Sequence, residues 1–269
     1  MLNNSIEDYP DKYELKQYLI NETDQKNVVS INPYLILELL KLELLDLDFS
    51  NIEITIPSND PLRALLHYNE KVVAIDSELR EERKTFSILH EIAHYVLPTH
   101  FNRIFLCCES HMSIKTDMSN EKEANQLAAD LIFHLLDKRA NEYKLNSKNI
   151  KLIGNEYKAS FEAVARRLVE KSMKKHMLVV YESFYNKHQK SSRVKYCIVS
   201  PLFKKHYHAQ TIHDDNNKIA NNLFEEKGRD ISNSIIEETK IITPAEKTLT
   251  AKNEYFTNSY NVFRIITVK

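Results

Sequence analysis

The stretch that decides the fold is FSILHEIAHYVL at Phe86–Leu97, an apolar run that contains two histidines and a glutamate. His90 and His94 are four residues apart, so on a helix they lie on one face, about one turn from each other. This spacing lets both imidazoles bind a single Zn²⁺ at about 2.0–2.1 Å. Glu91 follows His90, a position from which a carboxylate acts on water without binding the metal. The apolar neighbours predict a buried helix.

A catalytic zinc site needs a third protein ligand and an open position for water. The downstream segment NEKEANQLAADLIF supplies candidates for this ligand. Glu121 and Asn125 share a helical face with Ala124 and Ala128, whose small side chains would let two helices approach closely. We therefore predict Glu121 as the third ligand and Asn125 as a hydrogen-bond partner of one ligand histidine. Glu123 is the alternative ligand, although it lies on a different face of this helix from the alanines.

Composition narrows the classes of function. The 269-residue chain has 37 basic and 38 acidic residues and a net charge of −1, so direct binding of nucleic acid is not expected. Its two glycines exclude a P-loop and a dinucleotide-binding fingerprint. No apolar run reaches the roughly 18 residues that cross a bilayer, so no membrane association is expected. Three cysteines and a polar N-terminus without the pattern of a targeting peptide predict a cytoplasmic protein.

Hydrophobic periodicity predicts the order of the elements along the chain. We expect helices over 33–45, 78–97, 120–140 and 160–175, and strands over 52–56, 64–68 and 71–75. The last two strands would form a hairpin. After Met177 the segments MLVVYES, RVKYCIVSPLF and YNVFRIITV are strand-like. This change predicts a domain boundary near 177.

The sequence FSILHEIAH, followed by ExxAN and AADL, resembles the ImmA/IrrE-type metallopeptidases of bacteria and mobile elements. The resemblance extends upstream to INPYLILELL and AIDSELREERKTFS, and downstream to SFEAVARRL. It covers most of residues 28–180, and the later strands resemble the β-rich tail of longer members. Ala93 replaces a glycine that many members carry within the histidine motif, a difference that removes no metal ligand.

The resemblance implies an α+β protein with a zincin-like core, mostly helical with a small sheet, followed by a β-rich sensor-like domain. The expected domains are an N-terminal extension at 1–27, the metallopeptidase domain at 28–176 and the sensor-like domain at 177–269. The implied activity is that of a zinc endopeptidase that cleaves a helix-turn-helix repressor and so relieves repression under stress. A small-molecule or signal ligand would bind the C-terminal domain.

The predicted mechanism gives Glu91 the part of general base, which accepts a proton from the attacking water and passes it to the leaving amine. Tyr95, His100 and His111 are equivalent candidates for stabilising the oxyanion. The strand at 71–75 is expected at a sheet edge, where it would pair with an extended substrate. The alternative function is that of a non-proteolytic sensor with a structural zinc.

Other polar clusters have simpler interpretations. Cys107, Cys108 and His111 lack the usual Cys-x₂₋₄-Cys spacing of a second metal site, so reduced thiols are favoured. His206 and His208 alternate along a candidate strand, where solvent-facing side chains are expected.

Overall fold

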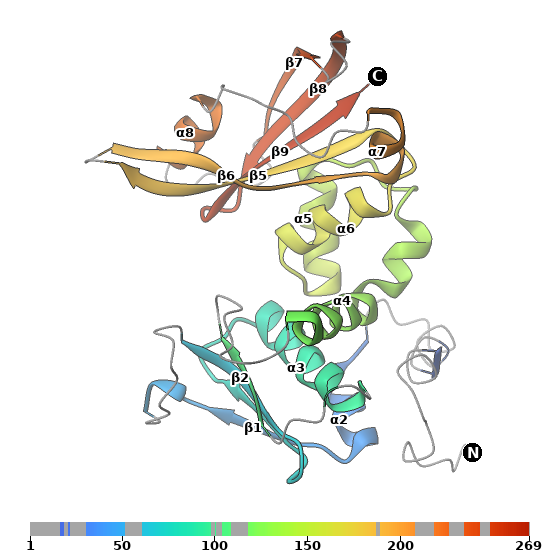
Figure 1. Cartoon of the computed structure of the whole chain (residues 1–269), viewed down its shortest axis with the longest axis vertical. Helices are drawn as coiled ribbons and strands as arrows, with labels where there is room; N and C mark the ends of the chain where they lie inside the picture. The colour runs from blue at the N-terminus through green and yellow to red at the C-terminus, as the bar shows by residue number, and fades with distance from the viewer. Residues whose placement is uncertain are drawn as a thin grey trace. The chain divides into compact units, whose positions relative to one another are not determined.

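A computed structural model of the chain describes residues 17–18, 21, 31–51, 61–97, 100, 104–108, 118–186, 189–207, 218–225, 234–242 and 248–268 (Figure 1). The fold is of the predicted α+β class, with helices and two sheets. The chain divides into two compact units, Met1–Leu135 with Glu156–Ala159 and Leu136–Asn155 with Ser160–Lys269. The domain boundary predicted near 177 stays a prediction. Within the described residues, every helix is too short or too polar to traverse a bilayer.

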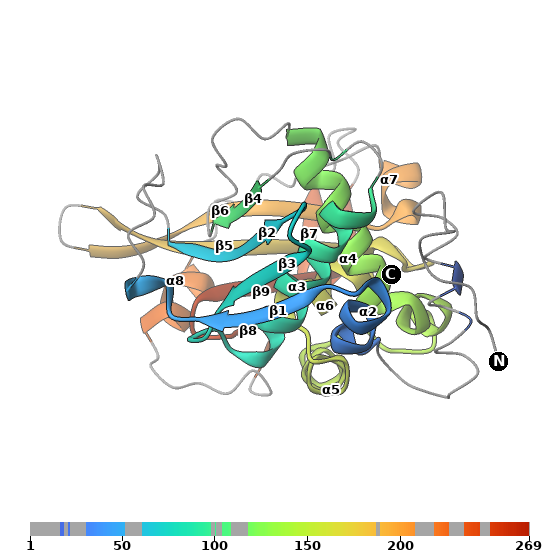
Figure 2. The same ribbon diagram turned by 90° about the horizontal axis from the view of Figure 1, so that it is seen from below.

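The first unit contains a four-stranded sheet. Its strands are β1 (Glu43–Leu47), β2 (Leu62–His67), β3 (Val72–Asp76) and β4 (Ile104–Cys108), in the order β1-β3-β2-β4 (Figure 2). The β2–β3 hairpin confirms the sequence prediction, and β1 adds to β3 in parallel. The prediction that the strand at 71–75 lies at an edge is wrong, because β3 is paired on both sides. The edge strands of this sheet are β1 and β4.

Helix α2 (Pro33–Leu40) is shorter than the predicted helix over 33–45. It begins as expected, with a proline in the first turn and with Asn32 accepting a hydrogen bond from the backbone N–H of Tyr34 at 3.0 Å. It ends at Leu40, its C-cap Lys41 has a φ of 54°, and the chain then enters β1. The leucine-rich segment after Lys41 favours a helix locally, but parallel pairing with β3 makes it a strand.

Helices α3 (Glu81–Val96) and α4 (Met118–Arg139) match the predicted helices over 78–97 and 120–140 within a few residues. Helix α3 packs against β2 and β3. Its apolar residues Ile88, Leu89, Ile92 and Ala93 are fully buried. The histidine motif therefore lies on a helix whose orientation is fixed by the core.

The second unit is built on a five-stranded antiparallel sheet. Its strands are β5 (His176–Asn186), β6 (Gln189–Val199), β7 (Ile235–Ile242), β8 (Thr248–Thr257) and β9 (Asn261–Val268), in the order β6-β5-β9-β8-β7. The remaining helices are α5 (Ser147–Tyr157), α6 (Phe161–Glu170), α7 (Pro201–Tyr207) and α8 (Lys218–Glu225). The strand-like character expected after Met177 is thus present, although β7, β8 and three of these helices were not predicted.

The two faces of this sheet carry different partners. Met177, Val179 and Tyr181 on β5 pack with Leu223 of α8 in one hydrophobic core. On the opposite face, the hydroxyl of Tyr196 donates a 2.6 Å hydrogen bond to Glu162 of α6, and Asn261 donates to the same carboxylate at 2.7 Å. Because side chains alternate along a strand, one face of the sheet packs against α8 and the other face contacts α6.

Two further expectations differ from the structure. The predicted helix over 160–175 has the expected cap, Ser160, which accepts from the backbone N–H of Ala163, but it ends at Glu170. Pro201 starts α7, so His206 lies on a helix rather than on the expected strand. The predicted strand at 52–56 and His208 lie outside the described residues.

Candidate metal centre

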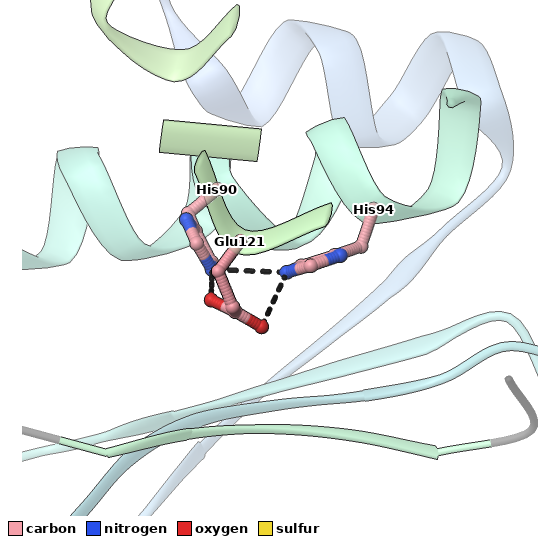
Figure 3. A group of neighbouring side chains, drawn as sticks. All are labelled: His90, His94 and Glu121. Carbon is pink, nitrogen blue, oxygen red and sulfur yellow. Dashed lines mark hydrogen bonds and ion pairs between the residues drawn. The ribbon is translucent and has the colours of Figure 1, made fainter. Parts of the chain in front are cut away.

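Helix α3 places His90 and His94 one turn apart on the same face (Figure 3). Their Nε2 atoms are 3.0 Å apart, and each residue is only 1% exposed. The apolar residues around them hold the helix against the sheet, so the two imidazoles have little freedom to separate. Their arrangement is the one that four-residue spacing on a helix dictates.

Helix α4 brings Glu121 to the two imidazoles (Figure 3). Its Oε2 lies 3.3 Å from Nε2 of His90, and its Oε1 lies 3.4 Å from Nε2 of His94. Ala124 and Ala128, which follow on the same face of α4, are fully buried. The alanine face identified in the sequence is thus the packed face, and the carboxylate at its start joins the histidines.

The spacing of the three groups fits a tetrahedral ion. Bonds of about 2.0–2.1 Å at tetrahedral angles place ligand atoms about 3.3–3.4 Å from one another. The two Nε2 atoms are 3.0 Å apart, and each imidazole lies 3.3 or 3.4 Å from the carboxylate oxygen that it faces. One ligand atom from each of the three residues lies within 4.8 Å of the other two. Two imidazole nitrogens and a carboxylate oxygen form a donor set suited to Zn²⁺. The residues present therefore fit a three-ligand metal site.

The protonation states also suit a metal. Burial opposes ionisation of Glu121, but the adjoining imidazoles of His90 and His94 outweigh it and hold the pKa of this carboxyl well below its usual range. Burial lowers the pKa of His94. The anionic carboxylate and the neutral imidazole are the forms that bind a metal, and both shifts favour them.

Glu91 is completely buried, and neither of its carboxylate oxygens has a hydrogen-bond partner within the described structure. Burial raises the pKa of Glu91 to about 8, with the charge of His90 acting in the opposite direction. A buried polar group without a partner is costly and uncommon, and such groups concentrate at functional sites. The sequence predicted a general base at this position, and the environment of Glu91 suits that role.

The second ring nitrogen of His94 is hydrogen-bonded to His100, which the sequence did not identify as a residue that orients a metal ligand. Nδ1 of His94 lies 2.8 Å from Nδ1 of His100, which is fully buried. Burial and the neighbouring His94 lower the pKa of His100 to about 4, so one neutral imidazole donates and the other accepts. The ring of Phe105 stacks on His94 with centroids 4.3 Å apart. His100 therefore orients His94, and the hydrogen bond predicted from Asn125 to a ligand histidine stays a prediction.

His100 was a candidate oxyanion donor in the sequence, but it contacts the side of His94 away from Glu121. Tyr95 packs its ring against Tyr68 at 4.9 Å. His111 and the side chains of the two adjacent cysteines lie outside the described residues, so the interpretation of reduced thiols stays a prediction.

Residues 40–169 match the family model of the IrrE N-terminal-like domain, which belongs to a peptidase family. The chain contains an IrrE N-terminal-like domain. The matched segment includes both α3 and α4, and therefore every residue of the cluster. The resemblance to ImmA/IrrE-type proteins is confirmed by this match.

One solved structure similar to the whole chain is that of a Mycobacterium tuberculosis transcriptional regulator. The two share 12% sequence identity with a TM-score of 0.50, over 98% of this chain and 94% of the other. At this identity the likeness extends the comparison of fold beyond the IrrE N-terminal-like domain and carries no information on activity. No curated protein matches the sequence.

Proposed function

We propose that the protein is a zinc-dependent endopeptidase that hydrolyses a peptide bond in a protein substrate. In this proposal His90, His94 and Glu121 bind the metal, and Glu91 is the catalytic base. The observation that carries it is the convergence of three ligand atoms beside a buried, unpartnered carboxyl within an IrrE N-terminal-like domain. This combination supports a zincin-like core for residues 28–176.

In the proposed reaction, Glu91 transfers the proton and His100 orients a metal ligand. When bound, Zn²⁺ would supply Lewis acidity that activates the attacking water and polarises the scissile carbonyl. Glu91 accepts a proton from this water as its oxygen attacks the carbonyl carbon, and then gives the proton to the leaving amine. Burial raises the pKa of Glu91 to about 8 in the metal-free protein, and a cation bound nearby would lower it again, so that the ionised carboxylate could accept the proton. His100 holds His94 in one orientation.

We further propose that the substrate is a helix-turn-helix repressor and that its cleavage relieves repression under stress in the cytoplasm. The resemblance to ImmA/IrrE-type metallopeptidases supports this substrate class. The similar fold of a protein described as a transcriptional regulator is compatible with a role in regulation. The strands from 177 to 269 would then form a sensor-like domain that receives the signal.

The decisive experiment compares Glu91→Gln with Glu82→Gln, an exposed glutamate on the same helix. Each variant is incubated with zinc and a helix-turn-helix protein encoded beside this chain. We expect Glu91→Gln to retain the metal and lose cleavage, while Glu82→Gln cleaves as the wild type does. If the wild type and Glu91→Gln both bind zinc and neither cleaves, the non-proteolytic sensor with a structural zinc replaces the proposal.

A further inference from the structure

The second unit contains a cavity of about 140 Å³ on one face of its five-stranded sheet. The floor consists of two adjacent rows of side chains. His176 on β5 and Lys252 on β8 are both paired with Thr267 on β9, and Glu254 on β8 is paired with Ile265 on β9. Because side chains alternate along a strand, all five residues lie on the same face. The register of three strands thus builds this floor.

The wall of the cavity adds two more lysines. Lys144 and Leu145 come from the turn between α4 and α5, and Lys174 lies on the segment that leads into β5. Lys144 and Lys174 are exposed, and Lys252 is half-buried. None of the three ammonium groups forms an ion pair with a described residue. Three cationic side chains therefore face one small cavity without a carboxylate bound to them.

The other polar groups of the cavity do not cancel this charge. Glu254 is the one acidic lining residue, and its Oε1 accepts a 2.8 Å hydrogen bond from the backbone N–H of Ser147. His176 is neutral, because burial and the nearby Lys174 lower its pKa to about 4. Its Nδ1 is hydrogen-bonded to the hydroxyl of Thr267 at 3.0 Å. The cavity thus has an excess of two positive charges.

We propose that this cavity is a binding site for a small phosphate-type dianion, either inorganic phosphate or a small phosphate monoester. Lysine ammonium groups bind phosphate oxygens as compact point charges, and the excess of two positive charges in the cavity matches the charge of a dianion. The apolar side chains of Leu145 and Ile265 complete the lining. The volume admits one phosphate group with a few additional atoms.

The test measures binding of inorganic phosphate at low ionic strength by calorimetry, with the full chain. The pocket variant is Lys174→Gln with Lys252→Gln, and the matched control is Lys204→Gln with Lys205→Gln on α7. All four lysines are at least partly exposed and both variants lose the same charge. We expect the pocket variant to bind phosphate at least about tenfold more weakly and the control to stay within about twofold of the wild type. The backbone amide signals of Lys252 should shift when phosphate is added.

Glycerol 3-phosphate and malonate are two additional probes. The first identifies the source of the phosphate group, and the second tests whether the cavity binds carboxylates instead. Glycerol 3-phosphate binding more tightly than inorganic phosphate would indicate a monoester, and the reverse would indicate the free ion. Equal phosphate binding by all three proteins, no binding by the wild type, or binding of malonate in place of phosphate would each overturn the proposal. Because the readout is binding alone, its outcome does not depend on peptidase activity.

Discussion

Replacement of Glu91 by glutamine should change the pH dependence of stability in the metal-free protein. The ordinary pKa of this carboxyl is 4.5, and burial raises it to about 8 in the fold. The unfolded chain therefore loses its proton first as the pH rises. The contribution of Glu91 to the free energy of unfolding is fully present below about pH 4.5 and is lost progressively up to about pH 8. Glutamine has no such dependence.

The size of this loss of stability follows from the interval between the two pKa values of Glu91. Between pH 4.5 and 8 the free energy of unfolding of the wild type, relative to Glu91→Gln, should fall by about 1.4 kcal/mol per pH unit, or about 5 kcal/mol in all. The buried amide of the variant carries a penalty of its own of about 1–3 kcal/mol, which does not depend on pH. The slope, rather than the difference at one pH, is therefore the diagnostic quantity.

The assay is urea unfolding followed by circular dichroism at pH 5, 6, 7 and 8 in the presence of a chelator. Glu82→Gln is the control, because its exposed carboxyl should give a curve parallel to that of the wild type. Saturating Zn²⁺ should flatten the wild-type curve, since a cation nearby favours the ionised carboxylate. Parallel curves for the wild type and Glu91→Gln without metal would refute the reasoning.

Three more predictions concern packing and charge. Arg167→Met should lower the free energy of unfolding by about 3–5 kcal/mol, because the buried guanidinium makes two hydrogen bonds to Asp137. Its control, Arg166→Met, removes an exposed ion pair and should cost at most about 0.5 kcal/mol. Equal losses for the two variants in urea unfolding would contradict this prediction. As the pH falls from 6.5 to 4, the free energy of unfolding of the wild type should decrease by about 3 kcal/mol relative to that of His176→Gln. The reason is that the imidazole of His176 is protonated in the unfolded chain before it is protonated in the fold. A difference in free energy that stays constant across this range would contradict the prediction. Ala124→Leu should lower the free energy of unfolding by about 1–3 kcal/mol and weaken the binding of zinc, because this fully buried position on α4 has no room for a larger side chain. Calorimetry that finds wild-type affinity for zinc would contradict this prediction.

The candidate centre could be predicted to the extent that it depends on local periodicity. The spacing of His90 and His94 places them together on any helix, and the apolar residues between them indicate burial. Glu121 required one more step, which was to identify the small-residue face of α4 as the packed face. Both steps use only residues within one or two turns of a helix.

What could not be predicted depends on pairing between distant segments. The segment Glu43–Leu47 is leucine-rich and favours a helix on its own, but it becomes β1 by parallel pairing with β3, about 30 residues later. That strand displaces β3 from the sheet edge. His100 lies beyond the end of α3, and its contact with His94 has no periodic signal in the sequence.

The central claim is that two histidines of α3 and Glu121 of α4 hold one zinc ion. The most direct test is elemental analysis of protein purified without chelators, for the wild type, Glu121→Ala and Glu123→Ala. The account predicts about one zinc per chain in the wild type and in Glu123→Ala, and substantial loss of zinc in Glu121→Ala. No stoichiometric transition metal in the wild type, or loss of zinc in Glu123→Ala with retention in Glu121→Ala, would contradict it.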